Sequence, residues 1–484
     1  MGAERRALAM LAAVGAVAIA DVARAAAPGE APPDDDDGGL VIEEAPPAAE
    51  ATPVVALTGR LQVGAAVDLD VARDEGVVDA EARLDLLLTA RPPGSALDGE
   101  LAMGLRYGVL VPDGRGERGA VDVADARFGE SFVRWRSPWA LDVSLGLRAL
   151  RWGAVTALRP LDVLTPVDLR RGAAPWLDEP PIAVPALSVQ KVLGRVSLEV
   201  VWMPFFVLDD VFLARDDWRL AERGAVSVQP GVARALAGLS ERELERDQSR
   251  VILTDRPSSG GFPGDVAARA VFHGDAVDVG LVLGTQWERV PRFEALPSRL
   301  RGYATHVARR ELAGLELAWS VLGATLAADV LYASSATAYR ADGSSRTTSD
   351  GLLHWTIEAR VTPAIWLDVA VAVSERRLLD TPRDAFATPI EDEDLVIASA
   401  DSWQLAARVG LMLAFDGAVR LDAALRAGLD RADWTLAVGV TARLGGGASL
   451  TGGVIVFEGP PDGLGLGSLY DGNDSAYLRA TFTF

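Results

Sequence analysis

The stretch "WQLAARVGLMLAF", Trp403–Phe415, decides the fold of this chain. Every second residue between the two aromatic ends is apolar, while the intervening positions carry Gln404, Arg408 and Met412. A β-strand sends successive side chains to opposite faces, so this pattern predicts a strand with one apolar and one mixed, more polar face.

The length of this stretch indicates which solvent the apolar face meets. From Trp403 to Phe415 the chain rises about 40 Å at about 3.3 Å per residue. Tilted by about 45°, such a strand projects about 28 Å along the membrane normal, close to the apolar band between the aromatic girdles of a membrane barrel. A strand of a soluble sandwich usually has only about five or six residues. The stretch therefore predicts a membrane-spanning strand.

The same alternation recurs along the chain from Leu57 onward. Residues 57–71 place leucine, valine, alanine and glycine on one face and Arg60, Asp68 and Asp70 on the other. Further examples are 79–90, 353–362 and 421–430. No long segment of this part repeats its apolar residues with helical spacing.

The connections alternate between short and long. Short ones are expected at 137–140, 193–195, 362–364, 416–418 and 445–447, and long polar ones at 113–119, 153–185, 207–264, 334–350, 376–400 and 458–474. Short turns at one end and long loops at the other are typical of outer-membrane barrels. We therefore predict an all-β fold, a transmembrane antiparallel up-and-down β-barrel of about 18 strands, with 16 as the alternative. It would have short periplasmic turns, long extracellular loops and one loop folded inward.

The chain ends in "SAYLRATFTF", Ser475–Phe484, which alternates to its last residue. An open sheet edge is not tolerated in hydrocarbon, so this strand is expected to pair with the first one and close the barrel. The aromatic end resembles the C-terminal signal that the assembly machinery of bacterial outer-membrane proteins reads. Tyr477, Phe482 and Phe484 fit that signal, and Arg479 stands where a glycine is usual.

The N-terminus has the pattern of a secretory signal peptide. Arg5 and Arg6 precede the apolar run 7–20, and small residues follow at 23–27. We assign 1–25 to the signal, 26–53 to a disordered, acidic, proline-rich periplasmic segment, and 54–484 to the barrel. The run Asp34–Asp37 lacks the spacing of calcium ligands and is interpreted as a solvated charge run.

Composition excludes several classes of protein. The net charge of −21 argues against nucleic acid as a partner and against a basic surface for anionic lipid. The chain has no cysteine, which removes disulfides, thiolate metal sites and a lipoprotein anchor. The expected partners are outer-membrane lipid, the barrel assembly machinery, an unidentified small solute and, in one reading, an export system.

One stretch carries a more particular likeness, "ESFVRWRSPWALDVSLGLRALRWGAVTALRPLDVLTPVDLRR", Glu130–Arg171. Its "RWG" at a strand end, followed by a loop with aspartate, proline, aspartate and arginine, resembles a family of large proteobacterial outer-membrane barrels grouped with alginate-export proteins and porins. Residues 196–206 and 311–333 continue the likeness. The family usually has a glutamine where this chain has 147–150 with Arg148, so no ligand is carried over. The resemblance implies a barrel with a folded-in loop.

The best candidate for a pore-narrowing loop is 152–171 with the strand end before it. Selectivity in such barrels is usually set by the narrowest ring. The candidate constriction residues are Arg148, Arg151, Trp152, Asp162, Asp168, Arg170 and Arg171. The alternative is a salt-bridged plug that fixes the shape of the barrel, and the sequence supports both readings.

The long connection 207–264 is expected to contain one or two short helices. "SEREL", Ser240–Leu244, has the form of a capping box, and Val232, Leu236 and Leu239 share one helical face before it. Such helices would cap the barrel mouth or act as a lid.

The sequence offers little catalytic chemistry. His273, His306 and His354 are far apart, and no serine motif or acid pair accompanies them. No metal-ligand cluster and no cofactor motif is present, so the prediction is a protein that is not an enzyme and has no cofactor. The proposed role is a channel for diffusion or export of small or apolar molecules. The alternatives are a plugged barrel that acts as a surface receptor or scaffold, and an outer-membrane hydrolase.

Overall fold

The computed structural model of this chain describes the strands and many of their connections. The described residues are 54–68, 77–92, 94–112, 121–166, 182–206, 252–253, 264–289, 292–295, 303–306, 308–339, 345–347, 351–379, 401–413, 418–429, 433–459 and 474–484. The signal, the acidic segment and the helices expected within 207–264 lie outside the described residues.

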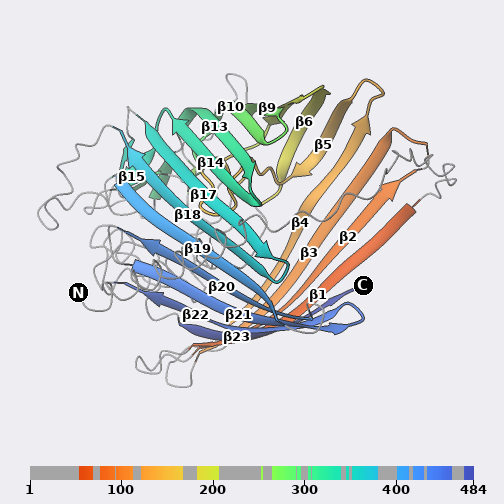
Figure 1. Cartoon of the computed structure of the whole chain (residues 1–484), viewed down its shortest axis with the longest axis vertical. Helices are drawn as coiled ribbons and strands as arrows, with labels where there is room; N and C mark the ends of the chain where they lie inside the picture. The colour runs from red at the N-terminus through yellow and green to blue at the C-terminus, as the bar shows by residue number, and fades with distance from the viewer. Residues whose placement is uncertain are drawn as a thin grey trace, which may run out of the picture. The chain divides into compact units, whose positions relative to one another are not determined.

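Eighteen strands form one large antiparallel sheet (Figure 1). They are β1 (Val54–Asp68), β2 (Val77–Arg91), β3 (Leu97–Pro112), β4 (Val121–Arg136), β5 (Leu141–Arg148), β6 (Val184–Leu193), β7 (Val196–Met203), β9 (Asp265–His273), β10 (Val277–Trp287), β13 (Arg309–Val321), β14 (Ala324–Ala333), β17 (Leu352–Ala364), β18 (Leu367–Leu378), β19 (Asp401–Leu413), β20 (Val419–Gly428), β21 (Asp433–Gly445), β22 (Ala448–Glu458) and β23 (Ser475–Thr483).

Each of these strands pairs with the next one along the chain, and the last pairs with the first. β23 runs antiparallel to β1 with Arg60 opposite Thr483 and Asp68 opposite Ser475. This pairing closes the sheet, so no membrane-facing backbone edge remains in it. The predicted 18-stranded up-and-down barrel and the closing strand pair are confirmed.

The two ends of the barrel differ as expected. One end carries short turns, for example Gly194–Arg195 between β6 and β7 and Gly446–Gly447 between β21 and β22. Several boundaries were wrong by one to three residues. Residues 362–364 still belong to β17, and the turn follows at Ile365–Trp366. The connections expected at 153–185 and 376–400 overlap the ends of β6 and β18. In the decisive stretch, β19 ends at Leu413, and Phe415 lies outside the described residues.

Short strands outside the barrel belong to the connections at the opposite end. β8 (Ile252–Leu253) pairs parallel with β12 (Tyr303–His306), which pairs antiparallel with β11 (Arg292–Ala295). β15 (Thr337–Tyr339) and β16 (Ser345–Thr347) form a hairpin. Across the described ranges, the structure has no helix whose length and hydropathy would let it cross a membrane.

The outer face of the barrel is apolar. On β10, for example, Val279, Leu281 and Leu283 point outward and are exposed. Aromatic residues flank this surface at both ends: Trp135, Trp139, Phe272, Trp319, Trp366, Phe482 and Phe484 near the short turns, and Tyr107, Tyr332, Trp355 and Trp403 toward the long loops. A closed sheet with an apolar belt between aromatic girdles is the form that a bilayer requires. The chain is therefore an integral membrane β-barrel of the outer-membrane type.

The inner face is polar and charged, because the alternation places every second residue there. Arg60 on β1 contacts Asp85 on β2 at 3.0 Å, and Arg106 on β3 contacts Glu81 at 3.1 Å. On the other side, Arg269 on β9 forms two hydrogen bonds with Glu316 on β13. Two of these ion pairs join adjacent strands and the third spans β10, and such pairs are the expected lining of a water-filled lumen.

Candidate pore constriction

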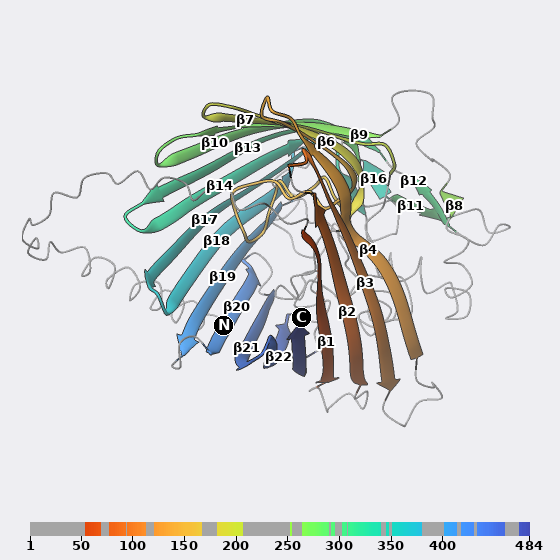
Figure 2. The ribbon, with the colours of Figure 1, turned by 90° about the vertical axis from the view of Figure 1, so that its right-hand side faces the viewer.

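The segment that follows β5, residues 149–166, folds into the barrel instead of projecting from its end. Figure 2 shows this gold-coloured segment enclosed by the strands. Its backbone is held by two acidic residues, one on β14 and one on β17. Asp329 on β14 accepts hydrogen bonds from the backbone N–H of Ala154 at 2.9 Å and of Val155 at 3.3 Å.

Glu358 on β17 is the second acidic anchor. It accepts hydrogen bonds from the backbone N–H of Thr156 and of Ala157, each at 2.8 Å, and from the Thr156 hydroxyl at 2.8 Å. Its side chain has no solvent exposure. A buried carboxylate needs such donors, and hydrogen bonds to a charged acceptor are stronger than neutral ones. The wall therefore fixes the position of the segment.

Two more wall residues bind the backbone oxygens of the segment. The Thr356 hydroxyl donates to the Leu158 carbonyl at 2.7 Å, and the Arg360 guanidinium donates to the Ala154 carbonyl at 3.1 Å. Wall side chains thus satisfy both donors and acceptors of a loop that forms no ladder of its own, which is a condition for burying irregular backbone.

Apolar packing supports the same placement. Leu150, Trp152, Leu161 and Leu164 of the segment are buried in one cluster with wall residues. The wall members are Val184, Ala186, Val201, Met203, Ala267, Val282, Leu312, Leu331, Ala333, Leu352 and Leu378. The Trp152 indole N–H donates to Glu199 on β7 at 3.0 Å. The segment is thus a packed part of the barrel interior on the side of β6 to β18.

Two glycines allow the close approach. Gly153 has φ +110°, and a Cβ there would overlap the Asp329 carboxylate. Gly314 on β13 lies under Leu161, whose side chain occupies the space a Cβ would need. The left-handed backbone favours glycine at 153, and the contact excludes a side chain at both positions.

Asp162 is the one acidic residue of the segment 149–166, and its pKa is shifted from the usual value of an aspartate. Burial raises the pKa of its carboxyl, and the neighbouring Arg159 and Arg151 oppose this effect. Arg159 lies 3.7 Å from Asp162 Oδ2, too far for a hydrogen bond. The Asp162 side chain is thus mostly enclosed by the fold.

The predicted constriction residues have different surroundings. Arg148, at the end of β5, donates to Ser144 at 2.6 Å, contacts Glu130 at 3.3 Å and lies over the Phe132 ring at 4.6 Å. Arg151 is exposed, whereas Trp152 is buried. Asp168, Arg170 and Arg171 lie outside the described residues. Of the predicted set, the structure brings Arg151 and Asp162 together within electrostatic range.

The residues that hold the segment have no distinctive pattern in the sequence. Asp329, Thr356 and Glu358 sit on the inner faces of strands, where the alternation makes them look like ordinary lumen residues. A weak signal existed: Asp329 is an acid flanked by apolar residues in "LAADVLYA". No feature of that stretch names its partner, which lies 175 residues away in the chain.

The histidines of β17 and β9 each lie beside one serine of a neighbouring strand. His354 on β17 has its Nε2 3.0 Å from the Ser374 hydroxyl, and His273 on β9 has its Nε2 3.0 Å from the Ser197 hydroxyl. Ser374 also donates to the Trp355 carbonyl, so it is held as part of the wall. Among the described residues, no cluster of three or more histidine, aspartate or glutamate side chains has the arrangement of a metal site.

The wall across from the anchored segment carries solvent-exposed charge. The side chains of Arg408, Arg60 and Asp368 are 57%, 49% and 48% exposed. Asp85 contacts both Arg60 and Arg83, and Asp98 contacts both Arg134 and Arg136. This wall is therefore polar and accessible, in contrast to the packed side.

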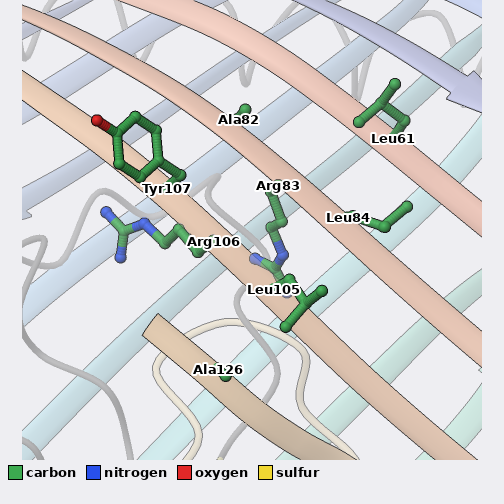
Figure 3. A pocket seen from close by; sticks show the side chains of 8 residues that line it. All are labelled: Leu61, Ala82, Arg83, Leu84, Leu105, Arg106, Tyr107 and Ala126. Atoms are coloured by element: carbon green, nitrogen blue, oxygen red, sulfur yellow. The ribbon is translucent and has the colours of Figure 1, made fainter. Parts of the chain in front are cut away.

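A pocket of about 420 Å³ lies on β1 to β4 (Figure 3). Its lining mixes Arg83 and Arg106 of the inner face with Leu61, Leu105 and Tyr107 of the outer face. One ligand cannot contact both faces of a single sheet, so the pocket does not define a binding site.

No family model and no curated protein matches the chain. Among solved structures, OpdL of Pseudomonas aeruginosa is similar at 11% identity and a TM-score of 0.46, over 89% of this chain and 98% of that one. OmpF of Salmonella typhi, in a complex with daunomycin, has 8% identity and a TM-score of 0.41, over 90% and 100%. A mutant of the Rh. blastica porin has 13% identity and a TM-score of 0.33, over 89% and 100%.

Proposed function

We propose that this protein is an outer-membrane channel for small polar solutes, with a lumen narrowed by the fixed segment 149–166. The observation that carries the proposal is the asymmetry of the interior. One side is filled by a segment that Asp329 and Glu358 anchor, and the other side keeps exposed ion pairs around Arg60 and Arg408. Charges of a pore lining remain solvated in this way.

The lining favours polar over apolar cargo. Solvated guanidinium and carboxylate groups attract polar solutes. They leave no continuous apolar surface along which an apolar molecule could pass. Diffusion through a static pore needs no further machinery, whereas export of the alginate type would require a periplasmic partner. Passive diffusion of polar solutes is therefore the simpler role for this barrel. Export together with a periplasmic partner is the second proposed role.

A plugged barrel is the main alternative, and the apolar cluster around Trp152 and Leu161 favours it on one side of the lumen. The test is conductance of the purified protein in planar bilayers. Steady single-channel steps are expected. Complete absence of conductance, also after removal of residues 207–263, would contradict the channel and support a receptor or scaffold.

We propose a channel and not an enzyme, because the Ser374 hydroxyl beside His354 donates to the Trp355 carbonyl and is held as part of the wall. Hydrolysis of lipid or peptide substrates that disappears in His354→Ala would contradict this part. The proposed location is tested by fractionation: the protein should be recovered with the outer membrane and should migrate differently on gels before and after heating.

A further inference from the structure

Two charged residues of the exposed wall, Arg408 on β19 and Asp368 on β18, have weak contacts with the protein. Their side chains are 57% and 48% exposed. Arg408 lies 3.6 Å from Asp422, and Asp368 lies 3.8 Å from Arg420. Both distances are too long for a hydrogen bond, and among the described residues neither side chain has a shorter polar contact. The guanidinium and the carboxylate are therefore open to a solute.

The contacts of Arg408 and Asp368 are weak because Arg420 and Asp422 bind each other. The Nε–H of Arg420 donates to both carboxylate oxygens of Asp422 at 2.9 Å. Such hydrogen bonds between ionised groups are stronger than a contact of 3.6 Å. Arg408 and Asp368 are thus the two ends of a row of four charged groups, one end positive and the other negative.

The strand register makes Arg408 and Asp368 diagonal neighbours on the paired strands β18 and β19 (Figure 1). Arg408 lies opposite Ala370, which is two residues along β18 from Asp368. Diagonal neighbours of this kind have Cα atoms about 7–8 Å apart. The other two corners of this patch are Ala370 and Gly410, and the Arg420 guanidinium occupies the space that a Cβ of Gly410 would need. No bulky apolar side chain stands at either corner.

This pair of residues lies close to the inward segment. Arg360 on β17 donates to the Ala154 carbonyl of the segment, and it lies opposite Ala370 in the strand register. Arg408 is therefore two strands away from this anchor, about 10 Å at about 4.8 Å per strand. A solute that passes beside the segment at this edge meets Arg408 and Asp368.

We propose that Arg408 and Asp368 select a small zwitterion, a solute whose carboxylate and ammonium groups are joined through one carbon. The Arg408 guanidinium donates to the carboxylate, and the Asp368 carboxylate accepts from the ammonium. A contact of about 2.8 Å at each end and about 2.5 Å within the solute together span about 8 Å, which matches the diagonal spacing. This inference rests on the proposed channel function and names the class of solute.

The first test compares L-alanine with lactamide, its uncharged isomer, in proteoliposomes that contain the full-length protein. The rate of isosmotic swelling reports how fast each solute enters. The wild type should take up alanine faster than lactamide, although the two solutes have the same composition. Arg408→Gln and Asp368→Asn should each lower the alanine rate toward the lactamide rate and leave the lactamide rate unchanged. Arg195→Gln, at an exposed arginine of the short turns, is the matched control and should keep the preference.

A second test measures binding by the single-channel current in KCl. L-Alanine should reduce the wild-type current with saturation. The half-blocking concentration should rise about tenfold in Arg408→Gln and in Asp368→Asn, because each variant loses a hydrogen bond between charged groups. Sodium lactate, which has the carboxylate but no ammonium, should block less than alanine.

The outcomes separate this inference from the channel proposal. Equal swelling rates for alanine and lactamide in the wild type, with a KCl current that alanine does not reduce, would overturn the inference and leave the channel intact. A block by lactate that depends on Arg408 but not on Asp368 would identify an anion site and would also overturn it. A wild type that conducts no KCl would contradict the channel, and this inference with it.

Discussion

The ring of Phe484, the last residue, lies against the backbone of Gly59 in the first barrel strand. The two residues exchange backbone hydrogen bonds of 2.9 Å in both directions, and a Cβ on Gly59 would overlap the ring. Phe482 stacks beside Phe484 with ring centroids 6.0 Å apart. The end of the chain is therefore built into the closing seam, with its aromatic side chains on the outer face.

Deletion of Phe484 should impair assembly more than it changes any pore property. The folded barrel loses one ring contact, an aromatic pair worth about 1 kcal/mol, and two backbone hydrogen bonds with Gly59 worth about 1 kcal/mol each. The assembly machinery loses the residue it is expected to read. Phe484→Trp should insert nearly normally. The measurement is the heat-modifiable fraction in the outer membrane. Wild-type levels of the deletion variant would contradict the predicted signal.

Gly59→Val should disturb the same seam from the other strand. The added side chain must displace the Phe484 ring, so we expect less heat-resistant folded barrel and a lower unfolding temperature. The double variant Gly59→Val with Phe484→Ala should recover part of the loss, because the clash is gone. If the double variant loses as much stability as the two single variants together, the clash with the Phe484 ring does not cause the loss.

Glu358→Gln should loosen the inward segment. The amide cannot accept all three hydrogen bonds that the carboxylate accepts from Thr156 and Ala157, and each bond to a charged acceptor contributes about 1.5–3 kcal/mol. We expect larger or noisier single-channel currents. Glu81→Gln, on the opposite wall, is the matched control and should keep a steady current. If Glu358→Gln and Glu81→Gln gave the same single-channel currents, the segment 149–166 would not form the constriction.

Gly153→Ala should destabilise the seating of the segment more than an ordinary glycine substitution does. Both Gly153 and Gly194 have positive φ, but only at Gly153 would a Cβ meet another residue, Asp329. Gly194→Ala should cost about 1 kcal/mol from backbone strain alone. Gly153→Ala should lower the unfolding temperature further and alter conductance. Equal losses of stability would show that the contact with Asp329 contributes nothing.

Asp162 predicts a pH dependence of stability. Its pKa in the folded protein is raised by burial, so the folded state favours the neutral carboxyl. The stabilisation is then present at low pH and is lost as the pH rises through the raised pKa. Asp162→Asn should remove this contribution and raise the unfolding temperature at neutral pH. The check is a series of unfolding curves between about pH 4 and pH 7, with exposed Asp275→Asn as control. A slope unchanged by Asp162→Asn would contradict the prediction.

The fold could be predicted because it depends on a local pattern. Alternation in stretches such as Trp403–Phe415 fixes which residues face the membrane, and the bilayer thickness fixes how long each strand is. The short and long connections then order the strands, and the closure of β23 on β1 follows because hydrocarbon tolerates no free edge. These steps need only neighbouring residues and the properties of the solvent.

The interior could be predicted only in part. The motif around Trp152 and Gly153 indicated an inward loop, but nothing local indicated that Asp329 and Glu358 would hold it, since these residues meet the loop across the barrel. The same limit applies to the buried amide of Gln286, because only the pairing of β10 with β13 places it opposite Arg310. Sequence alone determined which face each side chain takes, through the period of the strand. The tertiary structure decided which inner side chains meet, because closure of the barrel brings together residues that are distant in the chain.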